Sequence, residues 1–306
     1  MTGFVLPQFG IFAQGTHAHH FLEFDLEPGT TPAEAMAAFR RLRTPDVSAG
    51  GVNLVIAFGS APFRASAPER TPDDLAAFQP VTGRDGHAAP ATQHDAWLWI
   101  SGAEPDVTWQ SARLSAELVR DVARVAGEQQ AFTFRGGRDI TGFVDGTANP
   151  PMRHAGDIAL VPPGRVGEGG SHVLVMRWVH DLEAFNRLSM ADQERVFGRT
   201  KADSIELSPE CKPANAHIAR VETSVDGREL EIFRRSVPYG SAEEYGLYFL
   251  AFSAARSRFD TLLSRMFAAG DEEPRDRLTD FSRPVSGAYY FAPSLTALKE
   301  LAGQAA

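Results

Sequence analysis

The sequence has almost no cysteine, no excess of positive charge and no long apolar run. Of its 306 residues only Cys211 is a cysteine, so no disulfide can form within the chain and nothing requires an oxidising compartment. The formal net charge of −9 argues against a general nucleic-acid binder and against a partner of acidic membrane surfaces. No stretch could span a bilayer, and residues 1–15 contain no basic region followed by an apolar run. We therefore expect a cytoplasmic protein that binds neither nucleic acid nor membrane.

The composition that is present suits a protein with a sizeable core. Hydrophobic residues make up 43% of the chain, and its length allows one large domain or two of moderate size. We predict two domains, over residues 1–135 and 136–306, because the pattern of strands and helices occurs twice.

A strand followed by a helix is predicted near the start of each half. Phe21–Leu26 alternates as a half-buried strand does, and a Thr-Pro-Ala-Glu capping sequence then opens a helix over Pro32–Leu42. In the second half, Ser171–Val179 is predicted as a strand, and residues 181–188 as a helix that Asp181 caps.

A second strand and helix are predicted late in each half. The strand Ala96–Ile100 precedes a helix over residues 111–125, and the strand Tyr245–Phe252 precedes a helix over residues 256–269. Residues 127–140 are interpreted as the connection between the halves. The pattern predicts an α+β fold of duplicated ferredoxin-like domains, in which helices flank antiparallel sheets.

Three polar residues stand out, although each has an ordinary interpretation on its own. Asp145 lies between Gly142 and Gly146, where a turn is the commoner explanation. By residue type alone, His217 is more often a surface histidine or a hydrogen-bonded core histidine than a ligand. Strand alternation would place Arg234 and the next residue on opposite faces, so that one of the two points inward.

In combination these residues belong to motifs that resemble one family. The motifs are Gly-x-x-Asp-Gly-Thr-x-Asn-Pro at 142–150, Asn-Ala-His-x-x-Arg at 215–220 and Arg-x-Ser-x-Pro-Tyr-Gly at 234–240. Their order resembles that of the dye-decolourising peroxidases, and the compact bacterial B-type is the most similar. Further stretches of resemblance are 177–182, 198–201, 278–282 and 287–293. The resemblance implies a pair of ferredoxin-like domains with one haem b per chain, bound mainly by the second domain.

The resemblance also implies a role for each of the central residues. His217 would be the proximal iron ligand, with its other ring nitrogen donating to a carboxylate, for which we choose Asp280. Asp145 would take the first proton of hydrogen peroxide and return it to the departing oxygen, while Arg234 stabilises the developing negative charge.

Four further residues are expected around the cofactor. Thr147, Asn149 and Arg199 would line the haem or meet its propionates, and the guanidinium fork of Arg199 suits a carboxylate. Ser236 stands where some relatives carry asparagine, and we expect its hydroxyl to order a water on the same face as Arg234.

The resemblance implies a haem b peroxidase that reduces hydrogen peroxide and oxidises organic donors such as dyes and phenols, as a homodimer or larger homo-oligomer. One alternative is a haem carrier or porphyrin-handling protein, including one that releases iron, and another is an interaction module without cofactor. A metal cluster at His17, His19 and His20 and haem ligation by Cys211 are weaker possibilities. Relay of electrons to a surface-bound donor remains open for several aromatic residues: Trp178, Tyr239, Tyr245, Tyr248, Tyr289 and Tyr290.

Overall fold

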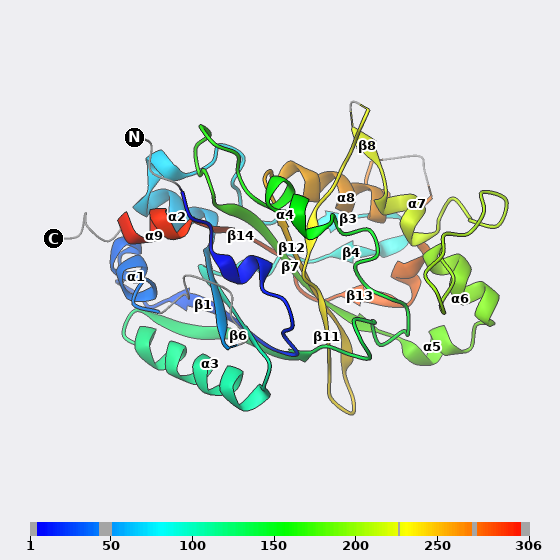
Figure 1. Cartoon of the computed structure of the whole chain (residues 1–306), viewed down its shortest axis with the longest axis horizontal. Helices are drawn as coiled ribbons and strands as arrows, with labels where there is room; N and C mark the ends of the chain where they lie inside the picture. The colour runs from blue at the N-terminus through cyan, green and yellow to red at the C-terminus, as the bar shows by residue number, and fades with distance from the viewer. Residues whose placement is uncertain (1–4, 43–50, 226, 271–273, 301–306) are drawn as a thin grey trace.

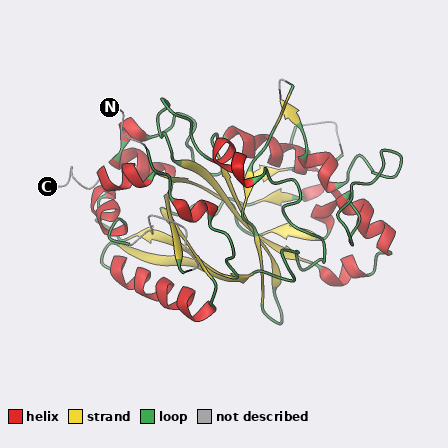
Figure 2. Cartoon of the chain, in the orientation of Figure 1, coloured by secondary structure: helices red, strands yellow, loops and turns green. Residues whose placement is uncertain are grey.

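The computed structural model describes residues 5–42, 51–225, 227–270 and 274–300, and their strands run through the centre with helices around them (Figure 2). The first half is built from β1 (Ala18–Leu26), α1 (Pro32–Phe39), β2 (Asn53–Phe58), β5 (Ala96–Gly102), α3 (Pro105–Val119) and β6 (Ala123–Phe132). Its four strands are antiparallel and lie in the order β2-β5-β1-β6.

The second half repeats this order with different connections. Its main elements are β7 (Ser171–His180), α5 (Leu182–Asn186), α6 (Met190–Phe197), α7 (His217–Val221), β10 (Phe233–Arg234), β11 (Val237–Gly240), β12 (Tyr245–Ser253), α8 (Ser257–Phe267) and β14 (Ala288–Ala292). The strand order is β10-β12-β7-β14, which corresponds position by position to the order in the first half. The duplicated ferredoxin-like α+β fold predicted from the sequence is therefore confirmed.

Shorter elements fill the connections between these units. They are η1 (Phe9–Phe12), α2 (Ser60–Ser66), η2 (Pro68–Arg70), β3 (Val81–Thr82), η3 (Arg84–Gly86), β4 (Ala88–Ala89), α4 (Met152–Ala159), β8 (Ser224–Val225), β9 (Arg228–Glu229), η4 (Arg277–Asp280), β13 (Ser282–Pro284) and α9 (Leu295–Glu300). Among the described residues, no helix is long and apolar enough to cross a membrane.

The two halves join into one sheet and share a core. Phe291 of β14 pairs with Phe58 of β2, so the sheet continues from the second half into the first. Between the halves, the rings of Phe21 and Tyr248 stack with centroids 3.8 Å apart, and Trp97 donates a hydrogen bond of 3.0 Å to the Tyr248 hydroxyl. These side chains are buried, as aromatic residues in strands usually are.

Helices cover the outer faces of the sheet. In Figure 1, α1 and α3 lie on the side of the first half, and α8 lies over the second half. Phe39 of α1 packs with Phe24 and Leu98 of the first half, while Phe259 of α8 packs with Leu174 and Met176 of β7. Amphipathic helices on a half-apolar sheet bury both apolar faces, and this supplies much of the driving force for folding.

The helix starts predicted from capping sequences are confirmed. The Thr31 side chain accepts a hydrogen bond from the Glu34 N–H, and the Glu34 carboxylate accepts one from the Thr31 N–H. The Asp181 carboxylate caps α5 by accepting the Ala184 N–H at 2.8 Å. The first helix ends at Phe39, however, which is earlier than the predicted Leu42.

Three local predictions were wrong. The helix predicted over residues 111–125 is α3, which begins at Pro105 and ends at Val119. The connection predicted over residues 127–140 begins within β6, which extends to Phe132. β6 lies at the edge of the sheet and carries many polar residues, so its sequence lacks the alternation of a half-buried strand. It forms a strand because it pairs with β1. The sequence around His217 also suggests the start of a strand just after it, but His217 is the first residue of α7.

Candidate functional site

A cavity of about 790 Å³ lies between the outer sheet face of the second half and the helices α7 and α8, which contact each other. Its volume is typical of sites for small molecules and cofactors. Its apolar wall consists of Leu174, Met176 and Trp178 from β7, Leu247 and Phe249 from β12, and Phe259, Leu263 and Met266 from α8. Polar residues gather at other parts of the wall, on α7, on β10 and on the loop that carries Asp145.

The position of His217 is fixed by a buried carboxylate. Its Nδ1 lies 2.6 Å from Oδ2 of Asp276, whose side chain is fully buried, and Oδ1 of Asp276 accepts the N–H of Leu278. A carboxylate accepts hydrogen bonds, so Nδ1 carries the proton and Nε2 is left as a lone-pair donor. Because His217 lines the cavity, Nε2 is available to a metal there.

Asp276, and not Asp280, is therefore the partner of His217. Asp280 pairs with Arg275 at 2.6 Å and lies 3.9 Å from His87. Both aspartates flank the turn η4, but Asp276 is its N-cap, which directs the carboxylate inward, whereas Asp280 ends the turn and stays partly exposed. The signal that could have identified Asp276 is its capping position before Arg277.

Asp145 faces the cavity from a loop that requires glycine. Gly142 and Gly146 have φ angles of 92° and 76°, in the region that disfavours other residues. A Cβ at Gly142 would lie 2.6 Å from Cε of Lys201. Oδ1 of Asp145 accepts the Gly146 N–H at 2.7 Å. Burial raises the pKa of the Asp145 carboxyl, although the positive charge of Arg234 acts in the opposite direction.

Arg234 reaches the same cavity from β10. Among the described residues, its guanidinium has no carboxylate partner within 4.0 Å, so its charge is not consumed by an ion pair. The neighbouring Arg235 points to the opposite side, where it donates to the Ala13 carbonyl and lies over the Trp99 ring. The alternation predicted for these two arginines is therefore confirmed.

Asn149 connects the loop of Asp145 to the strand of Arg234. Its side-chain oxygen accepts the Arg234 N–H at 2.9 Å, and its side-chain nitrogen donates to the Arg234 carbonyl at 2.8 Å. The amide thus pairs with the edge of β10 as a neighbouring strand would. This arrangement explains why Asp145 and Arg234, which are 89 positions apart in the sequence, line the same cavity.

The other expected residues differ in their placement. Thr147, Asn149 and Arg199 all line the cavity. The Arg199 guanidinium pairs with Glu222 at 2.8 Å, while its Nε is buried without a hydrogen-bond partner. Ser236 is absent from the wall, since its hydroxyl accepts the Leu250 N–H at 3.2 Å within the sheet. The hydroxyl of Ser236, which was expected to order a water beside Arg234, is therefore engaged within the sheet and is not on the cavity wall, although β10 and β11 keep one continuous register along β12.

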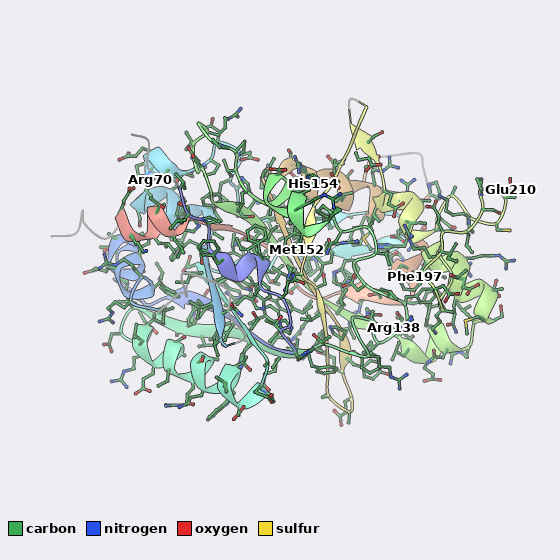
Figure 3. All side chains as sticks on the ribbon, in the orientation of Figure 1. Arg70, Arg138, Met152, His154, Phe197 and Glu210 are labelled. Atoms are coloured by element: carbon green, nitrogen blue, oxygen red, sulfur yellow. The ribbon has the colours of Figure 1, made fainter. Side chains whose placement is uncertain are left out.

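The residues present fit a flat, largely apolar cofactor that carries a metal and carboxylates. The cavity offers an imidazole nitrogen, a long apolar wall and, at Arg199, a buried donor without a partner. Phe197, labelled in Figure 3 on the side of α5 and α6, also lines the cavity and stacks on Phe143 with ring centroids 3.9 Å apart. Such walls exclude water from a bound group.

The weaker candidates lie elsewhere. Cys211 is exposed and does not line the cavity. The Nδ1 of His19 accepts a hydrogen bond from Trp99, whereas His20 bonds to Glu128 at 2.6 Å. In the described part of the chain, no group of three or more His, Cys, Asp or Glu side chains could hold a metal ion.

Two family models match the chain, and together they cover most of it. The model described as "Dyp-type peroxidase, N-terminal" matches residues 8–133, and that described as "Dyp-type peroxidase, C-terminal" matches residues 136–297. The dye-decolorizing peroxidase of Mycobacterium tuberculosis is 36% identical over 80% of this chain and 74% of its own length. That of Rhodococcus erythropolis is 32% identical over 91% and 84%.

Solved structures agree with these sequence matches. An Arg→Leu variant of DypB from Rhodococcus jostii, in complex with haem, superposes with a TM-score of 0.87 at 30% identity, over 94% of this chain and 96% of that one. A dye-decolorizing protein from V. cholerae superposes with a TM-score of 0.84 at 32% identity, over 95% and 98%. By sequence and by fold, this chain belongs to the Dyp-type peroxidase family.

Proposed function

We propose that the protein is a haem b peroxidase, with one haem per chain, that reduces hydrogen peroxide and oxidises organic donors in one-electron steps. The observation that carries this proposal is the convergence on one cavity of a carboxylate-bonded histidine, a carboxyl with a raised pKa and an arginine that has no carboxylate partner among the described residues. The related DypB variant is in complex with haem.

Residues of the cavity wall would bind each part of the haem. Nε2 of His217 would bind the iron, and Asp276 would make the imidazole a stronger electron donor through Nδ1. The apolar wall would cover the porphyrin, and Arg199 would meet a propionate. When bound, the haem would supply the two electrons that reduce peroxide, and the organic donors would then return these electrons one at a time.

Asp145 and Arg234 would act on the peroxide itself. Asp145 would accept the first proton of hydrogen peroxide and give it to the departing oxygen, a contribution of about 10²–10⁴-fold. Arg234 would stabilise the negative charge that develops on that oxygen, which is worth roughly 3–4 kcal/mol when one donor is decisive. Because the pKa of Asp145 is raised, its base form predominates only above a correspondingly higher pH.

The test compares Arg234→Leu with Asp145→Ala in the haem-loaded protein. Both variants should retain haem, because neither removes His217, and both should react more slowly with hydrogen peroxide. We expect the arginine change to slow the reaction more, since it removes the charge that stabilises the leaving oxygen. Stopped-flow absorbance at the Soret band gives the second-order rates. Wild-type rates in both variants would refute the distal assignment, while a slow Asp145→Ala alone would reverse only the ranking.

A haem carrier or iron-releasing protein is the alternative use of the same cavity. Such a carrier has no need of a charged arginine and a carboxylate with a raised pKa on the cavity wall, so the peroxidase is favoured. Peroxide turnover by the purified protein distinguishes the two.

Finer aspects of the function are part of the same proposal. We propose dyes and phenols as donors, a cytoplasmic location, and a homodimer or larger homo-oligomer. The single cysteine and the net charge of −9 support an intracellular protein without nucleic-acid or membrane partners. We also propose the domain boundary between residues 135 and 136, in the connection that follows β6.

A further inference from the structure

A second carboxylate lines the cavity in a network that the proposed mechanism does not use. Asp139 and His180 both line the cavity and are 7% and 8% exposed. Oδ1 of Asp139 lies 3.2 Å from Nε2 of His180, and Nδ1 of His180 lies 2.8 Å from the Ser282 hydroxyl. Oδ2 of Asp139 accepts both the backbone N–H and the hydroxyl of Thr141. Every part of this carboxylate is therefore held in place.

The same short loop holds Asp139 and Asp145. The Asp139 N–H donates to the Phe143 carbonyl at 2.9 Å, and the Gly142 N–H donates to the Asp139 carbonyl at 2.8 Å. This tight turn leaves both carboxylates on one cavity. A like charge nearby disfavours ionisation, so the pair must divide its protons unequally.

The surroundings decide which of the two is ionised. Burial alone would raise the pKa of Asp139, but the hydrogen bond and charge of His180, with the hydrogen bonds of Thr141, lower it. The pKa of Asp145 is raised by burial, and the negative charge of Asp139 raises it further. Asp139 is therefore the fixed anion, and Asp145 is the group that exchanges a proton.

The other charged groups around Asp145 are accounted for. Arg234 faces it from β10 and His217 from α7, and both lower its pKa. On the other side of the loop, the Arg138 guanidinium donates to the carbonyls of Gly142, Lys201 and Ala202. The Lys201 ammonium donates to Gln193 and lies over the Phe143 ring. Among the groups with the largest effects on the pKa of Asp145, Asp139 is the negatively charged one.

We propose that Asp139, held by His180 and Thr141, is a positioning residue that sets the pH above which Asp145 accepts the peroxide proton. This inference rests on the proposed function, because it concerns the same reaction. Arg234 favours the ionised form of Asp145 and Asp139 opposes it. The balance of these two charges therefore sets the pH range in which Asp145 can act as a base.

The first test is the pH profile of the Asp139→Asn variant. Asparagine keeps the size of the side chain and removes its charge. The acidic limb of the second-order rate with hydrogen peroxide should move to lower pH by about one unit. Asp139→Glu, which restores the charge, should return the limb toward wild type. In an Asp145→Ala background, Asp139→Asn should move nothing.

The chain provides a matched control in a second Asp–His pair. Asp74 lies 3.1 Å from Nε2 of His172, and neither residue lines the cavity. Asp74→Asn should leave the position of the acidic limb unchanged. If Asp139→Asn does not fold, Thr141→Val, which removes one hydrogen bond to Asp139, should give a smaller shift in the same direction.

A second readout separates this inference from the proposed function. The infrared C=O band that disappears in Asp145→Asn reports the protonated Asp145 carboxyl, and its titration needs no peroxide. In Asp139→Asn the midpoint of this band should fall by about one pH unit. A shifted midpoint in a protein inert to peroxide would refute the proposed function and support the coupling. Fast peroxide reaction with an unmoved midpoint, or an equal shift in Asp74→Asn, would overturn the inference alone.

Discussion

Asp276 shows how one side chain can serve both folding and the cofactor site. One carboxylate oxygen accepts the Leu278 N–H and thereby caps η4, and the other accepts from His217. The carboxylate is fully buried, so the two hydrogen bonds are what compensate its charge. Its orientation is therefore fixed before any cofactor binds, and the imidazole is fixed with it.

At this scale we predict that Asp276→Asn weakens haem binding by about 10–100-fold, as loss of a partner behind a metal ligand commonly does. His217→Ala should abolish stable haem binding and leave the chain largely folded. Soret titrations with haem, beside circular dichroism, measure both.

The matched control is Asp280→Asn, four positions further along the chain. Its carboxylate pairs with Arg275 and does not touch His217, so haem affinity should equal that of the wild type. An unchanged Soret band in His217→Ala would exclude this histidine as the ligand. A thiolate-type spectrum of the ferrous carbonyl form would indicate Cys211 instead.

At the scale of elements, the site depends on the alignment of a loop with a strand. β10 is short and pairs with β12 along one edge. Along its other edge it pairs with the Asn149 amide rather than with a strand. The amide therefore continues the sheet at the point where Asp145 and Arg234 are brought to the same cavity. Loops of this kind carry function because rigid elements position them.

We predict that Asn149→Ala destabilises the protein by about 1–3 kcal/mol, because it leaves the N–H and the carbonyl of Arg234 without partners. Misalignment of Asp145 and Arg234 should also slow the reaction with peroxide. Urea unfolding and stopped-flow absorbance measure the two effects. Asn186→Ala, at an exposed position on α5, is the control and should change neither. Equal behaviour of the two variants would show that the Asn149 amide does not align the site.

The elements that the sequence predicts well are those whose signals are local. In Phe21–Leu26 the apolar Leu22 and Phe24, which pack in the cluster under α1, alternate with the less buried Glu23 and Asp25, and Thr31 with Glu34 caps α1 within a single turn. β6 has no such signal, because its residues are mostly exposed and its partner β1 lies about a hundred positions earlier. The choice between Asp276 and Asp280 depended on which side of η4 faces α7. The capping position of Asp276 is the one local signal for this, and the packing of η4 against α7 decides it.

At the scale of the whole molecule, the halves are tied together beside the cavity. Asp74 belongs to the first half; its carboxylate lies 3.1 Å from Nε2 of His172 of β7 and accepts the Arg256 N–H at the start of α8. Burial alone would raise the pKa of Asp74, but the neighbouring His172 and the Arg256 N–H lower it to about 2. The first half thus fixes the start of the helix that covers the cavity.

We predict that this tie stabilises the protein only above acidic pH. The pKa of Asp74 falls from 3.8 to about 2 on folding, so its contribution is complete above the unfolded value and is lost as the pH falls through the folded value. Because the side chain is 38% exposed, we discount for solvent screening and expect Asp74→Asn to cost about 1 kcal/mol at pH 7. The difference in unfolding free energy from wild type should shrink between about pH 4 and pH 2. Urea titrations across this range measure it, with the exposed Asp73→Asn as control. A difference that stays constant with pH would mean that the charge of Asp74 does not join the halves.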